Sequence, residues 1–110
     1  MKIAVINNIK NENKVKALIE RLSKDKKITI KMIDNINTLN RNYDVYILIT
    51  NSIKDVLNLK NIIESCNKIV IITSNSNVKF VMCSIEVTTN LIHLNTDIDI
   101  IIEKINNMQI

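Results

Sequence analysis

Two apolar runs dominate the middle of the chain, Asp44-Val45-Tyr46-Ile47-Leu48-Ile49 and Ile69-Val70-Ile71-Ile72. Beyond Asp44, neither run contains the alternating polar residues of a strand that has one solvated face. Continuous apolar runs of this length are typical of strands in a parallel sheet that is covered on both faces. The two runs therefore predict the buried central strands of an α/β domain, with Ile47, Leu48, Ile71 and Ile72 in the core.

The rest of the chain alternates between strand and helix patterns. Further strands are expected at Lys2–Ile6 (with Val5 buried), Ile28–Lys31 and Val87–Leu94. Apolar residues three and four apart predict helices at Asn13–Leu22, Ile53–Cys66, Ser76–Ile85 and Asp97–Met108, with a short one at Asn35–Asn42. In the second of these helices the apolar face is predicted to contain Ile53, Val56, Leu57, Ile63 and Cys66, and Thr96 or Asp97 is available as N-cap of the last.

This order predicts one flavodoxin-like α/β domain over residues 1–110. Strand-helix repeats with right-handed crossovers build a parallel sheet with helices on both faces. The second and fifth strands are the most polar, which places them at the edges and favours the strand order 2-1-3-4-5. The chain has 110 residues, which is the size of a single domain.

The composition excludes several kinds of site. Gly and Pro are both absent, so the chain has neither the Walker phosphate loop nor the glycine-rich dinucleotide fingerprint. Turns must instead use Asn, Asp and Ser, which tolerate left-handed backbone conformations better than other side chains. Asn therefore has a structural role at the turns of this protein.

The net charge of +4 is spread along the chain rather than concentrated. The densest basic run, Lys24, Lys26 and Lys27, is interpreted as the solvated C-terminal end of a helix, so direct nucleic-acid binding is not expected. Cys66 and Cys83 have no metal-ligand spacing and are expected to be free thiols in a reducing cytoplasm. No apolar stretch reaches the roughly 18 residues of a membrane span.

Amide and hydroxyl side chains follow the predicted strands, where sites form in such sheets. They are Asn7 and Asn8, Thr50 and Asn51, the run Thr73–Asn75, and Asn95 with Thr96. Two interpretations stay open for Asn7 and Asn8: they turn the backbone, or they bind a ligand. The run that begins at Thr73 is expected to cap the following helix rather than to bind an anion. His93 lies on a predicted edge strand and is expected to be half-exposed rather than a metal ligand.

These strand ends resemble those of the response-regulator receiver family over essentially the whole chain. Met1-Lys2-Ile3-Ala4-Val5-Ile6-Asn7-Asn8 is similar to the first strand of that family, which ends in two acidic residues. In Tyr43-Asp44-Val45-Tyr46-Ile47-Leu48-Ile49-Thr50, the phospho-accepting Asp would fall at Ile49. Lys68-Ile69-Val70-Ile71-Ile72-Thr73-Ser74 matches the terminal hydroxyl of the fourth strand at Thr73, and Leu91-Ile92-His93-Leu94-Asn95-Thr96 places the Lys-Pro pair of the fifth at Asn95-Thr96.

The resemblance implies a degenerate receiver, or pseudo-receiver. Receivers hold Mg²⁺ with carboxylates, whereas Asn7 and Asn8 offer neutral oxygens, and Ile49 has no nucleophilic atom. Asn95 replaces the Lys that would neutralise a phosphoryl group. We therefore expect no catalytic residue, no metal and no cofactor, and a non-enzymatic signalling module that acts by protein contact without phosphorylation.

The family also implies an interface, formed by the segments Ser76–Ile85, Val87–Leu94 and Asp97–Met108. Its candidate residues are Ile85, Leu91, His93, Ile100 and Lys104. The expected partner is a second copy or another protein domain, and the chain is expected to be either a complete protein or the part that precedes a DNA-binding or ATPase output domain.

Two other classes of function compete with this one. The alternative is a flavodoxin-like domain that binds a nucleotide or phosphate at the Asn, Ser and Thr side chains that follow the strands. Only Tyr43, Tyr46 and Phe80 could stack on the ring of such a ligand. An active enzyme is least favoured, because no nucleophile or acid-base pair is predicted to converge.

Overall fold

The computed structural model describes residues 1–9, 12–35, 42–62, 68–75 and 90–107. In chain order, its strands and helices are β1 (Lys2–Asn7), α1 (Asn13–Ser23), β2 (Thr29–Met32), β3 (Val45–Ile49), α2 (Ile53–Ile62), β4 (Ile69–Thr73), β5 (Asn90–His93) and α4 (Ile98–Asn106). All five predicted strands and three of the predicted helices are confirmed. The helices expected at Asn35–Asn42 and Ser76–Ile85 fall largely or wholly outside the described residues, as do residues 87–89 of the expected last strand, Ile63, Cys66, Cys83 and Met108.

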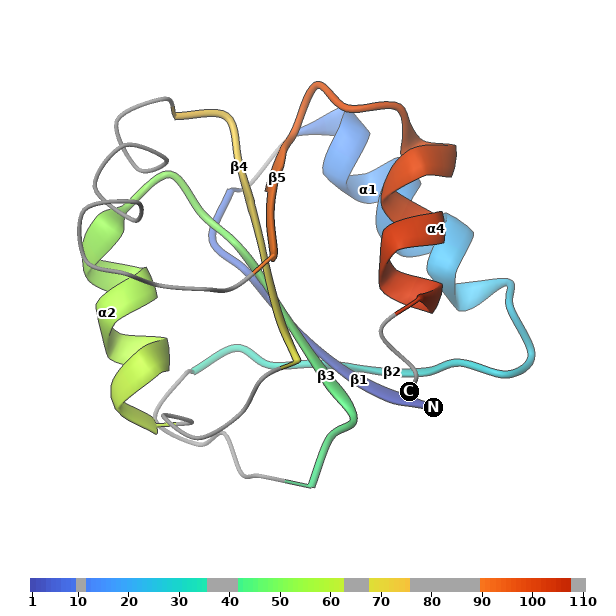
Figure 1. Ribbon diagram of the computed structural model, residues 1–110, viewed down its shortest axis with the longest axis horizontal. Coiled ribbons are helices and arrows are strands. Elements are labelled where there is room, and N and C mark those ends of the chain that lie inside the picture. The colour runs from blue at the N-terminus through green and yellow to red at the C-terminus, as the bar shows by residue number, and fades with distance from the viewer. Residues whose placement is uncertain (10–11, 36–41, 63–67, 76–89, 108–110) are drawn as a thin grey trace.

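The strands form one parallel sheet of order β2-β1-β3-β4-β5, which confirms the predicted flavodoxin-like topology (Figure 1). Every residue of β3 and of β4 is buried, whereas β2 exposes Thr29, Lys31 and Met32. The polar strands lie at the edges because an edge strand has a neighbour on one side only and keeps more of its surface in water.

Two helical layers cover the sheet, with α1 and α4 on one face and α2 on the other (Figure 1). The α1–α4 layer buries Val15, Leu18, Leu22, Ile101 and Ile105 against alternate strand residues such as Val5, Ile47 and Ile72. The α2 layer packs Val56 and Leu59 against the intervening strand residues, among them Ile6, Leu48 and Ile71. Side chains alternate between the faces of a strand, so a continuous apolar run supplies both cores at once.

Among the described residues of α2, the predicted apolar face was wrong at one residue. Leu57 is 44% exposed, whereas Leu59, which was not predicted, is 1% exposed. Residues two apart lie on nearly opposite sides of a helix, so burial of Leu59 turns Leu57 outward.

The predictions for the ends of the helices agree better with the structure than the prediction for the face of α2. Asp97 is the N-cap of α4, where its carboxylate accepts a hydrogen bond from the Asp99 N–H at 2.9 Å. The basic run follows the end of α1, and Lys24, Lys26 and Lys27 are all exposed, as expected. Within the described ranges, no helix has the length and apolar character that crossing a membrane requires.

Candidate functional site

The carboxyl edge of the sheet gathers the ends of β1, β3, β4 and β5. The register places Asn7 beside Ile49 and Thr73 beside His93. Parallel pairing continues for one residue beyond the strands, since the Asn8 N–H donates to the Ile49 carbonyl at 2.8 Å and the Thr50 N–H to the Ile72 carbonyl at 3.0 Å. The structure therefore brings the β1, β3 and β4 ends together, as the sequence analysis expected.

Asn7 stabilises a backbone turn, and Ile49 packs in the core. The half-buried Asn7 accepts a hydrogen bond at Oδ1 from the Ile9 N–H at 3.0 Å, which stabilises the turn after β1. This contact favours the turn interpretation over ligand binding for Asn7. Ile49 is 0% exposed and belongs to the core under the α1–α4 layer, so its side chain is not accessible from this edge.

Asp55 lies at the centre of a first group of contacts, here called the Asp55 cluster (Asn8, Thr50 and Asp55). One carboxylate oxygen, Oδ2, accepts hydrogen bonds from Thr50 Oγ1 at 2.6 Å and from Asn8 Nδ2 at 2.9 Å. The Thr50 side chain also accepts from the Ser52 N–H at 3.0 Å. Thr50 is only 1% exposed, so its hydroxyl depends on Asp55 for an acceptor.

Asp55 was not among the predicted site residues. Those residues follow the ends of strands, whereas Asp55 is in the first turn of α2, five residues after Thr50. The helix dipole favours a carboxylate in the first turn of a helix, and α2 directly follows a central strand. The position of Asp55 in that turn is the sequence signal by which it could have been predicted.

Asn51 organises the second group, the Asn51 cluster (Asn51, Thr73, Ser74 and Asn75). Its Oδ1 accepts from Thr73 Oγ1 at 3.1 Å, from the Ser74 N–H at 2.9 Å and from Ser74 Oγ at 3.0 Å. Its backbone carbonyl accepts from Asn75 Nδ2 at 3.0 Å. An amide oxygen has two lone pairs, so three donors saturate it. Thr73, 1% exposed, in turn accepts from the Asn75 N–H at 3.1 Å, and the helix that this run is predicted to cap lies outside the described residues.

The end of β5 has a local contact of its own. His93 is half-exposed, as expected, and its Nδ1 accepts from the Asn95 N–H at 3.0 Å, so the tautomer that fits has its proton on Nε2. Asn95 is exposed. In the part of the chain that the structure describes, no three His, Cys, Asp or Glu side chains gather as metal ligands.

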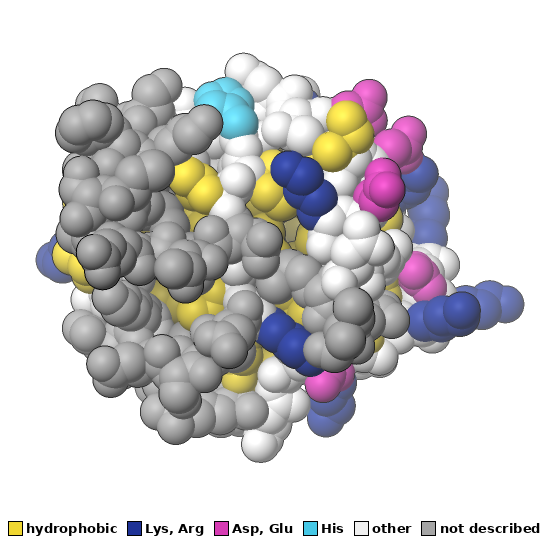
Figure 2. Space-filling model, viewed as in Figure 1, with side chains coloured by type: hydrophobic (Ala, Val, Ile, Leu, Met, Phe, Trp, Pro, Cys, Tyr) yellow, Lys and Arg dark blue, Asp and Glu magenta, His cyan; other side chains and the backbone are white. Residues whose placement is uncertain are grey.

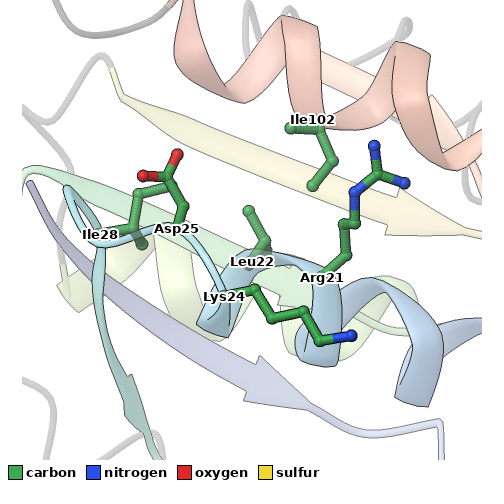
Figure 3. Close-up of a pocket in the computed structure, with 6 residues that line it drawn as sticks. All are labelled: Arg21, Leu22, Lys24, Asp25, Ile28 and Ile102. Atoms are coloured by element: carbon green, nitrogen blue, oxygen red, sulfur yellow. The ribbon is translucent and has the colours of Figure 1, made fainter.

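A cavity of about 260 Å³ lies elsewhere, between the end of α1, the start of β2 and α4 (Figure 3). It is lined by Arg21, Leu22, Lys24, Asp25, Ile28 and Ile102. Its two cations have partners, since Arg21 pairs with Asp99 and Lys24 with Glu20. The cavity is at the amino end of β2, away from the carboxyl edge.

The predicted interface residues fall on two elements. Leu91 and His93 are half-buried residues of β5, and Leu91 packs under the α2 layer. Ile100, 46% exposed, and Lys104 lie one turn apart on the surface of α4, and Ile85 is outside the described residues. Figure 2 shows the histidine at the surface on this side of the molecule, with basic and hydrophobic side chains near it.

No protein-family model and no curated protein matches this sequence.

Proposed function

We propose that this protein is a non-enzymatic, receiver-like signalling module of the cytoplasm that acts through protein contacts and without phosphorylation. One observation carries the proposal: among the described residues, polar side chains of the carboxyl edge bond to one another. The hydroxyls of Thr50, Thr73 and Ser74 and the side-chain amides of Asn8 and Asn75 all donate within the Asp55 and Asn51 clusters. The position that matches the phospho-accepting Asp holds Ile49, which is buried in the core.

The alternative, a nucleotide- or phosphate-binding domain, is less well supported by the same contacts. A phosphate bound at this edge would lie near the negative charge of Asp55, and the Ser74 N–H and hydroxyl that could donate to it already donate to Asn51 Oδ1. Binding would also break several of these hydrogen bonds, each of which contributes about 0.5–1.5 kcal/mol to stability.

The contact surface proposed is the side of the molecule formed by β5 and the outer face of α4. Ile101 and Ile105 point into the core, and Asp99 faces α1 through its ion pair with Arg21. Ile100 and Lys104 therefore lie on the remaining side of α4, away from α1. An exposed Ile with a neighbouring cation suits a partner that presents an apolar residue beside a carboxylate, either on another protein domain or on a second copy.

The phosphorylation half of the proposal is tested with Mg²⁺ and acetyl phosphate. We expect no gain of a phosphoryl mass and no rise in thermal midpoint, because neutral amide oxygens do not offset the cost of removing water from Mg²⁺. A phosphorylated wild-type protein, or one that Mg²⁺ alone strongly stabilises, contradicts the proposal.

Restoring the family residues provides the converse test. The quadruple variant Asn7→Asp, Asn8→Asp, Ile49→Asp, Asn95→Lys should lose stability, since Ile49→Asp buries a charge and Asn8→Asp places a carboxylate against Asp55. Mg²⁺ should recover part of that loss by binding the folded state. If the quadruple variant does not fold, the double variant Asn7→Asp, Asn8→Asp keeps Ile49 and should show the same Mg²⁺-dependent rise. A folded variant that does not respond to Mg²⁺ shows that these positions are wrongly matched to the family.

The proposed protein contact is tested by substitution of Ile100. Ile100→Asp should weaken association through the β5–α4 surface, measured by sedimentation equilibrium for self-association or by titration with a partner domain. Leu57→Asp is a matched control, because Leu57 is equally exposed on a helix of the other layer, 44% against 46%. If the two substitutions weaken association equally, the contact role proposed for this surface is wrong.

A further inference from the structure

The cavity between α1, β2 and α4 has an apolar lining with charged groups at its sides (Figure 3). Leu22 is 1% exposed and Ile28 is 7% exposed, and the half-buried Ile102 packs on the same core under the α1–α4 layer. A volume of about 260 Å³ is many times that of a water molecule and lies just below the roughly 300–1,000 Å³ of pockets for drug-sized ligands. The cavity therefore has room for a small organic molecule with an apolar group.

The Asp25 carboxylate is held in place at one side of this lining. The Asp25 N–H donates to the Leu22 carbonyl at 3.3 Å, and the Asp25 carbonyl accepts from the Ile28 N–H at 3.1 Å. Its Oδ1 accepts from the Lys27 N–H at 2.9 Å, whereas in the described part of the chain Oδ2 has no hydrogen-bond partner. Asp25 is half-buried, so Oδ2 is a preorganised acceptor for an ammonium group.

Arg21 lies on the other side of the cavity, with Leu22 and Ile102 between it and Asp25 (Figure 3). Its Nη2 donates to Asp99 Oδ1, which holds the guanidinium beside α4. A guanidinium has five N–H donors, so Arg21 keeps donors for a carboxylate after this contact.

The charges around the cavity favour a ligand that carries both signs. Lys24 also lines the cavity, but it pairs with Glu20 at 3.5 Å and keeps 72% of its side chain exposed. A purely anionic ligand would lie beside the Asp25 carboxylate, and a purely cationic ligand would lie beside Arg21 and Lys24. A zwitterion is favourable on both sides, with its ammonium group at Asp25 and its carboxylate at Arg21.

We propose that this cavity binds a free aliphatic amino acid such as leucine. The ammonium group donates to Asp25 Oδ2, and the carboxylate accepts from the Arg21 guanidinium. The side chain packs on Leu22, Ile28 and Ile102, and among the described residues that line the cavity the apolar ones are all aliphatic. The site is separate from the carboxyl edge and from the β5–α4 surface, so it adds a ligand to the module proposed above.

Titration of the wild-type protein with related ligands tests this assignment, by calorimetry and by backbone amide chemical shifts. Leucine should bind saturably, one per chain, and should shift the amides of Leu22, Asp25, Ile28 and Ile102. N-acetyl-leucine lacks the ammonium group and leucinamide lacks the carboxylate, so each should bind at least about tenfold more weakly. Glycine keeps both charges without the apolar side chain and should also bind at least about tenfold more weakly.

Two substitutions connect each charged group of the ligand to its residue. Asp25→Asn keeps an acceptor oxygen for the Lys27 N–H, and it should remove the preference for leucine over N-acetyl-leucine. Arg21→Ala should remove the preference for leucine over leucinamide, and it should fold because the lost ion pair is largely exposed. A purely structural role of either residue would weaken all the ligands equally. Asp34→Asn and Lys16→Ala, exposed changes outside the cavity, are the matched controls and should bind leucine as the wild type does.

Three results would overturn the proposal. The first is the lack of saturable leucine binding to the wild-type protein up to about 10 mM, a concentration at which binding would be very weak. The second is equal binding of leucine and N-acetyl-leucine by the wild type, which would make the ligand a simple apolar carboxylate. The third is a set of amide shifts centred on Asn8 and Asn51, which would place the ligand at the carboxyl edge instead.

Discussion

Replacing Asp55 by Ala removes the acceptor that joins the ends of β1 and β3 to the first turn of α2. The Asp55 carboxylate accepts from the hydroxyl of Thr50, which is 1% exposed, and from the exposed amide of Asn8. Without Asp55, the Thr50 hydroxyl is left buried without an acceptor, and the first turn of α2 loses a favourable negative charge.

The size of the effect follows from these contacts. A hydrogen bond to a charged group contributes about 1.5–3 kcal/mol, and the half-buried position of Asp55 points to the lower end. A carboxylate in the first turn adds roughly 0.3–1 kcal/mol through the helix dipole. We therefore expect Asp55→Ala to lower the free energy of unfolding by about 2–3 kcal/mol. Asp55→Asn, which keeps an acceptor oxygen and loses the charge, should cost about half as much.

Urea unfolding followed by circular dichroism measures these changes. A double-mutant cycle of Asp55→Ala with Thr50→Val should give a coupling energy of about 1–2 kcal/mol. The cycle of Asp55→Ala with Asn8→Ala should give less than about 0.5 kcal/mol, since Asn8 is exposed and water can replace it. A neutral Asp55→Ala, or equal coupling to Asn8 and Thr50, would show that the cluster does not stabilise this edge.

Further predictions concern the core and the helix ends, all measured by the same unfolding assay. Ile47→Ala and Ile71→Ala should each cost about 2–5 kcal/mol, because both side chains are buried on central strands; near-neutral values would refute the strand assignment. Asp97→Ala should cost about 1 kcal/mol through loss of the α4 N-cap, and Asp97→Asn should restore most of it. Arg21→Ala should change stability by less than about 1 kcal/mol, because its ion pair with Asp99 is largely exposed; a larger loss would mean that packing of the Arg21 chain was underestimated.

Local pattern was sufficient to predict the strands and their order. The apolar runs at β3 and β4 predicted buried central strands because they are short, rich in Ile and Val, and lack the alternating polar residues of a strand with one solvated face. The polar character of β2 and β5 placed both at the edges, and the order 2-1-3-4-5 that this favoured is confirmed.

The apolar face of α2 is a feature that local sequence pattern does not predict. Ile53, Val56 and Leu57 fit one helical stripe, and Val56 with Leu59 fit another. Both have helical periodicity, so the sequence does not distinguish them. The rotation of α2 against Ile6 and Leu48 of the sheet buries Leu59 and exposes Leu57.

By itself, the sequence determined the alternation of elements, the central strands and the lack of a carboxylate at Ile49, and it limited the N-cap of the last helix to Thr96 or Asp97, since each depends on residue type and short-range spacing. Only the tertiary structure decided the partners at the carboxyl edge. Asp55 bonds to Asn8 across 47 residues, and Asn51 bonds to Thr73 across 22. Those contacts form because the register of parallel strands brings their ends to one edge, and register is a property of the assembled sheet rather than of any single segment.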